Sequence, residues 1–371
     1  MDLKMQKNAF LGLIAACVVV LGLGAFGLAQ QYSWVEGATS ITMYVPWGLY
    51  ITLFLTLEAI GAGALLFAAL GRKAAVAVRI KLAVVGVVCA ACAGLAIMPD
   101  LGHPLTSWRL FFAPNATSPL MLDVWLLCAT LVFGVLLFVG LRWNKQGLAK
   151  AGSVGSAAFS LLLVTGTAIM FCSLPGKLGW ESTSEIGVAV VQTLAAGASV
   201  ALLLKFKAEE NSVDLPKFAI AVLLANALLV AAEGLLLAYR DDFALKALEA
   251  VMFGSYAPVF WAGAIVGIVA PVVLFAMKRN VIASWCVLAG LLLSKFAFVV
   301  RGSVYPTYGE MASNISIPLL APAHGPQTVQ SYVPTMNEFF VAAAVLGLAV
   351  LLVVIVINSK LVPSEDTGDR A

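Results

Sequence analysis

Residues 46–70 read PWGLYITLFLTLEAIGAGALLFAAL, an apolar stretch long enough to cross a lipid bilayer as one helix. A hydrocarbon core of about 30 Å requires about 20 predominantly apolar residues in helical form. Comparable stretches recur along the whole chain, and their unbroken hydrophobicity excludes a membrane β-barrel, whose strands alternate in short runs. We predict ten spans, at residues 8–29, 46–70, 80–98, 119–141, 152–172, 185–204, 216–238, 257–277, 281–300 and 336–357.

The composition also indicates a membrane protein. Hydrophobic residues make up 62% of the chain and charged residues 11%, whereas soluble domains average about 25% charged residues. We therefore predict an all-α polytopic membrane protein, in which residues 1–362 form a single integral membrane domain and residues 363–371 a disordered tail. Within that domain we expect two four-helix bundles, at about 46–172 and 185–300, with flanking helices at 8–29 and 336–357.

The first span has a second reading, as a secretory signal peptide cleaved near Ala29. The apolar region of a signal peptide is about 7–15 residues long. The stretch 8–29 is longer than that, which favours a retained helix.

A weak internal repeat supports the two-bundle interpretation. LEAIGAGALL (57–66) aligns with VQTLAAGASV (191–200), which pairs Glu58 with Gln192 and Gly63 with Gly197. Both segments lie in spans that run in the same direction, so the repeat would be parallel. Small residues that pack helices together also produce such similarity, and both explanations stay open.

The basic residues predict the orientation in the membrane, because cytoplasmic connections are enriched in Lys and Arg. Most of the 22 basic residues fall on the side that holds both termini. We therefore expect a bacterial inner (cytoplasmic) membrane protein with both termini cytoplasmic and residues 100–125 facing outward. The small net charge of +3 reflects this bias and does not suggest nucleic acid. The basic residues on the terminal side are Lys4, Lys7, Arg72, Lys73, Arg79, Lys81, Arg142, Lys145, Lys150, Lys205, Lys207, Lys217, Lys278, Arg279, Lys360 and Arg370.

The outward connection, DLGHPLTSWRLFFAPNATSPLMLDVW (100–125), carries His103, one of only two histidines in the chain. Neither histidine lies inside a span, so a bis-histidine haem cannot be held there. The cysteines all fall inside spans, among small apolar residues, and are best read as packing residues. We expect no haem, no iron–sulfur cluster and no other metal site in this chain.

Several charged residues lie inside spans, where each costs about 2.5–3.5 kcal/mol at mid-helix. One interpretation is structural, with ion pairs such as Glu233–Lys295 joining helices. The other is a polar pocket near the outer surface that handles protons. In it, Asp123 or His103 accepts a proton from a hydroxyl group, and Glu58 either relays that proton or bonds a neighbouring helix. Aromatic residues near the outer ends of the spans fit an interfacial belt. They are Tyr44, Trp47, Tyr50, Trp108, Trp125, Trp180, Tyr239, Tyr256 and Trp261.

Three segments together resemble the NrfD/PsrC family, the quinone-handling membrane subunits of complex iron–sulfur molybdoenzymes. They are PWGLYITLFLTLEAIGAGALL (46–66), the 100–125 connection, and YVPTMNEFF (332–340), which resembles the start of the last helix in ten-span members. Asp123, after Ser118 and Pro119, also resembles that branch. The sequence departs from the family pattern at His103, where the family commonly has arginine.

The resemblance implies a quinol/quinone oxidoreductase subunit. Menaquinone or ubiquinone would bind between spans two to five, and electrons would pass to or from a separate iron–sulfur subunit with several clusters on the outer face. A molybdopterin catalytic subunit would complete the assembly. The resemblance implies that Asp123 and His103 are the catalytic residues, with Asp123 as the proton acceptor and His103 and Arg109 near the headgroup or the partner interface. It also implies a quinone site that includes Arg109, Trp47, Tyr50 and Trp125, and a second rank of proton-relay residues: Glu58, Glu233 and Lys295.

Two other functions remain open. A secondary transporter also has many spans and buried charges, but such folds usually break paired spans at their centre with Pro or Gly, and no such pair is visible. A passive anchor that tethers a partner without redox chemistry is the third interpretation.

Overall fold

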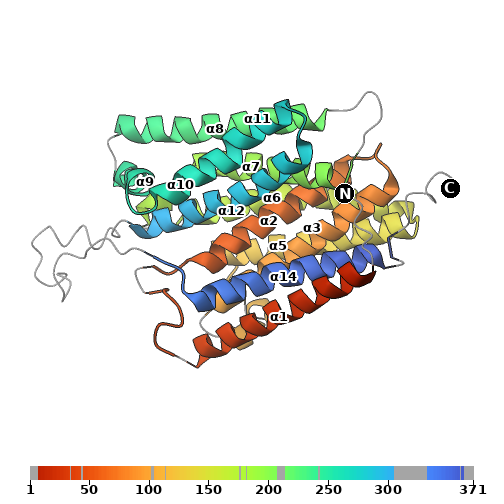
Figure 1. Ribbon diagram of the computed structural model, residues 1–371, viewed down its shortest axis with the longest axis horizontal. Coiled ribbons are helices and arrows are strands. Elements are labelled where there is room, and N and C mark those ends of the chain that lie inside the picture. The colour runs from red at the N-terminus through yellow and green to blue at the C-terminus, as the bar shows by residue number, and fades with distance from the viewer. Residues whose placement is uncertain are drawn as a thin grey trace, which may run out of the picture.

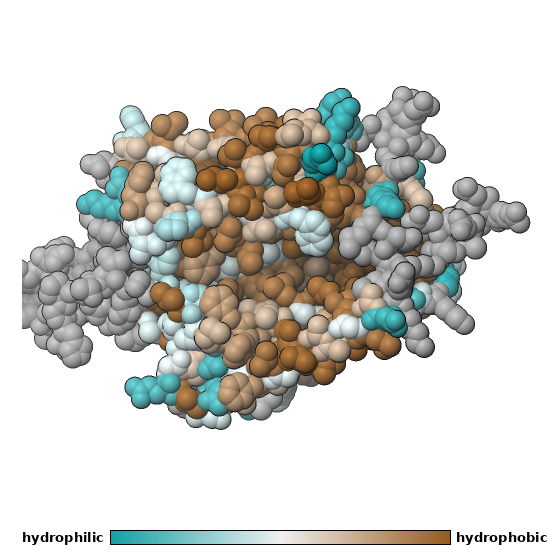
Figure 2. Space-filling model, viewed as in Figure 1, coloured by the Kyte–Doolittle hydropathy of each residue, from teal (hydrophilic) through white to brown (hydrophobic). Residues whose placement is uncertain are grey.

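The computed structural model describes residues 7–33, 35–42, 45–101, 104–112, 114–174, 177–180, 182–206, 214–240, 243–304, 332–359 and 361–362. Within these ranges the regular structure is helical, and no strand is present. Ten helical segments are long and apolar enough to cross a membrane. The chain is therefore an all-α, multi-pass membrane protein, as predicted. The helices run side by side along the long axis (Figure 1), and hydrophobic side chains cover the middle of the visible face (Figure 2).

Each predicted span overlaps one observed helical segment. The eighth span is continuous but contains a π-helical turn, η4. The sequence did not predict α9 (Phe243–Phe253) or the short α4 (Arg109–Phe112). The spans are α1 (Lys7–Tyr32), α2 (Leu49–Leu70), α3 (Val76–Ile97), α5 (Pro119–Arg142), α6 (Gln146–Cys172), α7 (Ser184–Leu203), α8 (Leu215–Arg240), α10–η4–α11 (Ala257–Ala264, Ile265–Val269, Ala270–Ala276), α12 (Asn280–Val304) and α14 (Met336–Asn358).

The two ends of the bundle are called the Trp180 end and the Arg79 end, each after one residue. The Trp180 end holds the connections 33–48, 98–118, 173–183 and 241–256, in their described parts. The Arg79 end holds residues 71–75, 143–145, 204–206 and 277–279, together with the start of α1 and the end of α14. The tail at 363–371 lies outside the described residues.

Two groups of four spans repeat the same packing pattern. In the first bundle α2 contacts α3 and α6, and α5 contacts α3 and α6. In the second bundle α7 contacts α8 and α12, and α10–η4–α11 contacts α8 and α12. The bundles join along α2 and α7, with further contacts of α2 to α12 and of α7 to α6. Helices α1 and α14 pack against each other and flank the first bundle through α3 (Figure 1).

Helices α2 and α7 approach most closely at Gly63 and Gly197. A Cβ atom added to Gly63 would lie 2.9 Å from the Cα atom of Gly197, and one added to Gly197 would lie 2.8 Å from that of Gly63. Small residues permit such close contact between helices in a membrane. These are the two glycines that the internal repeat pairs, so the bundles meet at matching positions. This packing supports the repeat as a real structural relation.

Candidate functional site

Three polar side chains from three helices of the first bundle meet in its interior. The Thr167 hydroxyl oxygen on α6 lies 2.7 Å from Glu58 Oε1 on α2 and 2.5 Å from Asp123 Oδ1 on α5. All three residues are buried. The structure thus brings together Glu58 and Asp123, two of the residues that the sequence marked, through a threonine that the sequence analysis did not single out.

A single hydroxyl group cannot satisfy both carboxylates. Thr167 carries one proton, and its oxygen also lies 3.1 Å from the carbonyl oxygen of Leu163. An ionised carboxylate only accepts hydrogen bonds, so two ionised carboxylates would leave one contact between oxygen lone pairs. One proton on either carboxyl group resolves this, because that group then donates to Thr167, which donates to the other. The arrangement is suited to holding one exchangeable proton.

Local sequence features position Asp123 and Thr167 close to each other on α5 and α6. Pro119 occupies the first turn of α5, where its missing N–H costs no hydrogen bond, and Asp123 follows one turn later. Glycines bring α6 close to α5: a Cβ added to Gly152 would lie 2.5 Å from the Cα atom of Leu137, and one added to Gly140 would lie 2.5 Å from that of Ala149. The helices are also close beside Thr167, because a Cβ added to Gly166 would lie 2.7 Å from the Cδ1 atom of Leu126.

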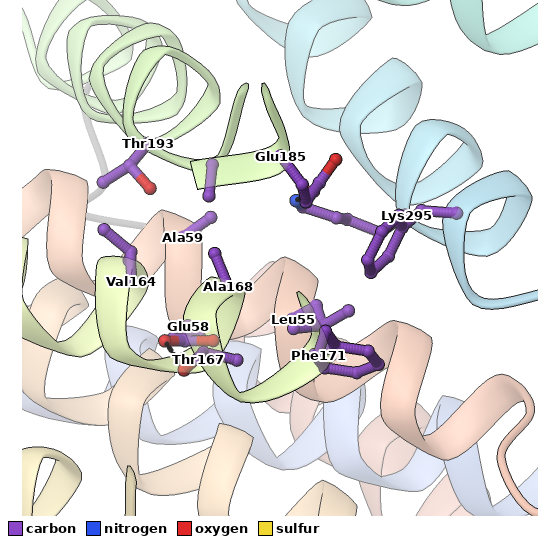
Figure 3. Close-up of a pocket in the computed structure, with 12 residues that line it drawn as sticks. Leu55, Glu58, Ala59, Val164, Thr167, Ala168, Phe171, Glu185, Thr193 and Lys295 are labelled. Atoms are coloured by element: carbon purple, nitrogen blue, oxygen red, sulfur yellow. Dashed lines mark hydrogen bonds and ion pairs between the residues drawn. The ribbon is translucent and has the colours of Figure 1, made fainter. Parts of the chain in front are cut away.

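A cavity of about 20 Å³ adjoins Glu58 and Thr167 at the junction of the two bundles. Figure 3 shows Glu58 and Thr167 on one side of it, with Glu185 and Lys295 on the other. Lys295 Nζ lies 3.0 Å from Glu185 Oε1. A volume of about 10–15 Å³ is enough for one water molecule, so the cavity suits a water molecule and is too small for a quinone ring.

The expected ion pair between Glu233 and Lys295 is wrong. Lys295 pairs with Glu185, whereas Glu233 Oε1 lies 2.9 Å from Arg301 Nη1. Arg301 also donates a hydrogen bond from Nε to the carbonyl oxygen of Gly179. The choice of partner depends on how α7, α8 and α12 are rotated about their axes, and hydrophobicity alone does not specify that rotation.

A cluster of aromatic side chains adjoins the small cavity. The rings of Trp47 and Trp180 stack with their centroids 5.1 Å apart, and Phe171 packs edge-on against both. Phe171 and Phe298 also line the cavity. Trp180 is fully buried and donates a hydrogen bond from its indole to the carbonyl oxygen of Phe298.

The interfacial-belt interpretation is wrong for Tyr50, Trp180 and Tyr256, which are buried. Their polar atoms bond to backbone or side-chain groups of the protein, so these residues serve the core and not the lipid headgroup region. Trp108, Trp125, Tyr239 and Trp261 are exposed, as a belt requires.

A second polar cluster lies at the Trp180 end, where α14 and the α1–α2 connection meet α2. The Tyr50 hydroxyl donates to Gln31 Oε1 at 3.0 Å, and Gln31 Nε2 donates to the carbonyl oxygen of Pro99 at 2.8 Å. Both carboxyl oxygens of the neighbouring Asp100 are buried, with no hydrogen-bond partner in the described part of the chain.

Tyr332 and Glu338 complete this cluster. The Tyr332 hydroxyl accepts a hydrogen bond from the backbone N–H of Leu49 and donates one to Glu338 Oε1. Burial, and then the nearby Glu338 carboxyl, raise the pKa of Tyr332, so it stays a donor. Glu338 also caps α14 together with Thr335. The segment 332–340 predicted the start of a helix, but it did not predict the contact of Tyr332 with Leu49 of α2.

The other predicted site residues are not gathered around Thr167. Arg109 is exposed, with its guanidinium 5.7 Å from the ring centroid of Trp108. Trp125 is 40% exposed, and His103 lies outside the described residues. Among the residues that the structure describes, no group of three or more His, Cys, Asp or Glu side chains is placed to hold a metal ion.

The chain is similar to known proteins over most of its length. Residues 37–306 match the family described as Polysulphide reductase, NrfD. A putative membrane subunit of dimethyl sulfoxide reductase from Halobacterium salinarum is 24% identical, in an alignment that covers 92% of this chain and 88% of that protein. Since the family match spans well over half of the chain, this protein belongs to the NrfD polysulphide reductase family.

Proposed function

We propose that this chain is the membrane subunit of a respiratory reductase complex and exchanges electrons and protons with the quinone pool. The observation that carries the proposal is the buried carboxyl pair, Glu58 and Asp123, bridged by the Thr167 hydroxyl. Oxidation of a quinol releases two electrons and two protons, so its site needs a proton acceptor. A carboxyl pair that holds one exchangeable proton is suited to that task.

The quinone headgroup binds nearer the Trp180 end than the carboxyl pair does, because the cavity beside Glu58 admits only water. Trp47, Tyr50, Arg109 and Trp125 are the proposed quinone-binding residues, with His103 and Asp123 as the catalytic pair. The unpartnered carboxyl oxygens of Asp100 support a site in this region, since they are buried acceptors that a quinol hydroxyl would satisfy.

The partner in this proposal is an iron–sulfur subunit with several clusters, docked at the Trp180 end and joined to a molybdopterin catalytic subunit. The name of the dimethyl sulfoxide reductase relative supports such an assembly. Basic residues at the Arg79 end, such as Arg72, Lys73 and Lys145, support a bacterial inner membrane orientation with that end cytoplasmic. The quinone, menaquinone or ubiquinone, is the ligand of this chain, and the clusters belong to the partner.

A secondary transporter is less well supported. In the described part of the chain, the irregular span is α10–η4–α11, and its counterpart α5 in the first bundle is a regular α-helix. Transporters of repeated architecture usually interrupt both matching spans at the binding site. A passive anchor would not require the buried carboxyl pair.

The test is quinol oxidation by the complex purified from its host in mild detergent. With Asp123→Asn, the rate is expected to fall by about 10²–10⁴-fold, the usual contribution of a general acid or base. Asp123→Glu is the matched control and should keep part of the activity. An Asp123→Asn complex that assembles normally and turns over at the wild-type rate would contradict the proton-acceptor role. Recovery of the chain without iron or molybdenum would contradict the complex.

A further inference from the structure

We infer that protons exchanged at the Glu58–Asp123 pair reach water through the second bundle and emerge at the Trp180 end, the side where electrons are exchanged. This inference rests on the proposed function. It adds Glu185, Gln192, Asn226 and Arg301 to the proposed proton-relay residues Glu233 and Lys295.

The first step of the pathway crosses the junction between the bundles. The cavity of about 20 Å³ that adjoins Glu58 and Thr167 is also lined by Glu185 and Lys295. Both of these residues line a larger cavity of about 90 Å³ inside the second bundle. One water molecule in the small cavity would therefore stand between the carboxyl pair and the Glu185–Lys295 ion pair (Figure 3).

The larger cavity has the properties of a hydrated chamber. At about 30 Å³ for each water molecule, it has room for about three. Three residues that line this cavity each carry a buried polar atom without a hydrogen-bond partner in the described part of the chain. These atoms are Gln192 Oε1, Asn226 Oδ1 and Arg301 Nη2. Buried polar atoms in native proteins are nearly always bonded to protein or to water. Water in the chamber supplies the missing partners.

The pathway then continues to the Trp180 end. Glu233 lines the chamber and also lines a third cavity, of about 270 Å³, together with Ser182, Thr183 and Ser184. These three residues lie where the connection from α6 enters α7, and Thr183 is exposed. The first two cavities share Glu185 and Lys295, and the second and third share Glu233, which gives the order of the proposed route from Glu58 to this surface.

The cavity at the Arg79 end, in the described part of the chain, does not continue this series. A cavity of about 440 Å³ at the Arg79 end is lined mainly by apolar residues of α2, α7 and α8 and shares no lining residue with the other three. The buried residues Ser156, Ser160 and Ser199 carry hydroxyl groups, but none of the three lines one of these four cavities.

This route also determines how much charge crosses the membrane during quinol oxidation. A quinol becomes a quinone and releases two electrons and two protons; the electrons pass to the partner subunit's iron–sulfur cluster, and the protons leave by the route above. Both reach the Trp180 end, so no net charge crosses the bilayer during turnover.

The first experiment blocks the chamber in the intact complex. Asn226→Leu and Gln192→Leu each remove a buried amide oxygen that has no partner in the described part of the chain and leave an apolar side chain of similar size. Quinol oxidation should then fall about tenfold or more. Sodium azide, a small proton carrier, should restore much of the rate. Thr130→Val is the matched control: Thr130 is buried on α5, bonds within its own helix, and lines none of the four cavities. Wild-type rates in both Leu variants, or a loss in assembled variants that azide does not reverse, would overturn the inference.

The second experiment measures charge movement. The complex is placed in liposomes with its partner subunits outward and ferricyanide, an acceptor that takes up electrons but no protons, in the outer solution. The expected result is acidification of the outer solution with no membrane potential and no stimulation by an uncoupler. A potential that an uncoupler abolishes would overturn the inference and leave the proposed function intact. If the wild-type complex did not oxidise quinol at all, the proposed function itself would fail.

Discussion

Glu58 and Asp123 come from different helices, yet both lie within hydrogen-bond distance of the same hydroxyl oxygen, that of Thr167. The pair is buried in the first bundle. A proton on either carboxyl group is therefore held in the interior, in contact with the other through one hydroxyl group.

Removal of the shared hydroxyl should uncouple the two carboxyl groups. Thr167→Val keeps the size of the side chain, and quinol oxidation is expected to fall about tenfold because a proton can no longer pass between Glu58 and Asp123. Thr167→Ser keeps the hydroxyl and should retain most of the rate. Since the three groups act as one unit, the losses of Thr167→Val and Asp123→Asn should not add in the double variant. Full additivity would count against a shared proton.

Lys295 should be required for stability mainly because Glu185 is buried. Lys295→Met leaves the Glu185 carboxylate without its cation, and loss of one partner of a buried pair costs about 3–5 kcal/mol. The double variant Lys295→Met/Glu185→Leu should recover most of that loss, because no unpaired charge remains. The measurement is the unfolding temperature of the purified chain in detergent. A double variant less stable than the single variant would show that the pair matters for another reason.

The close contact between α2 and α7 should not tolerate a side chain at Gly63. A Cβ atom there would lie 2.7 Å from the backbone nitrogen of Gly197, so Gly63→Ala forces the helices apart. The expected cost is about 1–3 kcal/mol, as for other overpacked interiors. Gly12→Ala is the control, because nothing lies within 4 Å of the added atom. Equal unfolding temperatures for the two variants would contradict the packing described here.

Tyr332 should link the last span to the start of α2. Tyr332→Phe removes the group that accepts from the Leu49 N–H and donates to Glu338. The expected cost is about 1–3 kcal/mol, because both groups stay buried without that partner. The unfolding temperature of the purified chain measures it, and an unchanged value would show that the hydroxyl contributes nothing to the link.

The same contact predicts a pH dependence. The pKa of Tyr332 is raised from its ordinary value of 10.0, first by burial. A raised pKa in the folded state gives stability that is present below pH 10.0 and is lost as the pH rises above it. Stability should therefore decline above that pH more steeply in the wild type than in Tyr332→Phe. Identical slopes in an alkaline titration of the unfolding temperature would rule this out.

The sequence by itself determined the fold class and the ten spans. Long apolar runs specify membrane helices without help from tertiary contacts, because a backbone in lipid must satisfy its own hydrogen bonds. The irregular elements were harder to predict: α9 is a short amphipathic helix between spans, and η4 is a π-helical turn inside a continuous apolar run. Glu58, Asp123 and Lys295 could be marked from the sequence alone, because a charge inside an apolar run is costly wherever it faces.

Only the tertiary structure decided which of these charges meet. The Glu58–Thr167–Asp123 contact joins three helices, and the pairs Glu185–Lys295 and Glu233–Arg301 depend on how each helix is rotated about its axis. Thr167 and Gln192 are ordinary residues of an apolar helix until neighbouring helices supply a carboxyl group or a cavity. Hydrophobicity fixes that a helix lies in the membrane, whereas close packing at glycines such as Gly63 and Gly197 fixes which faces touch.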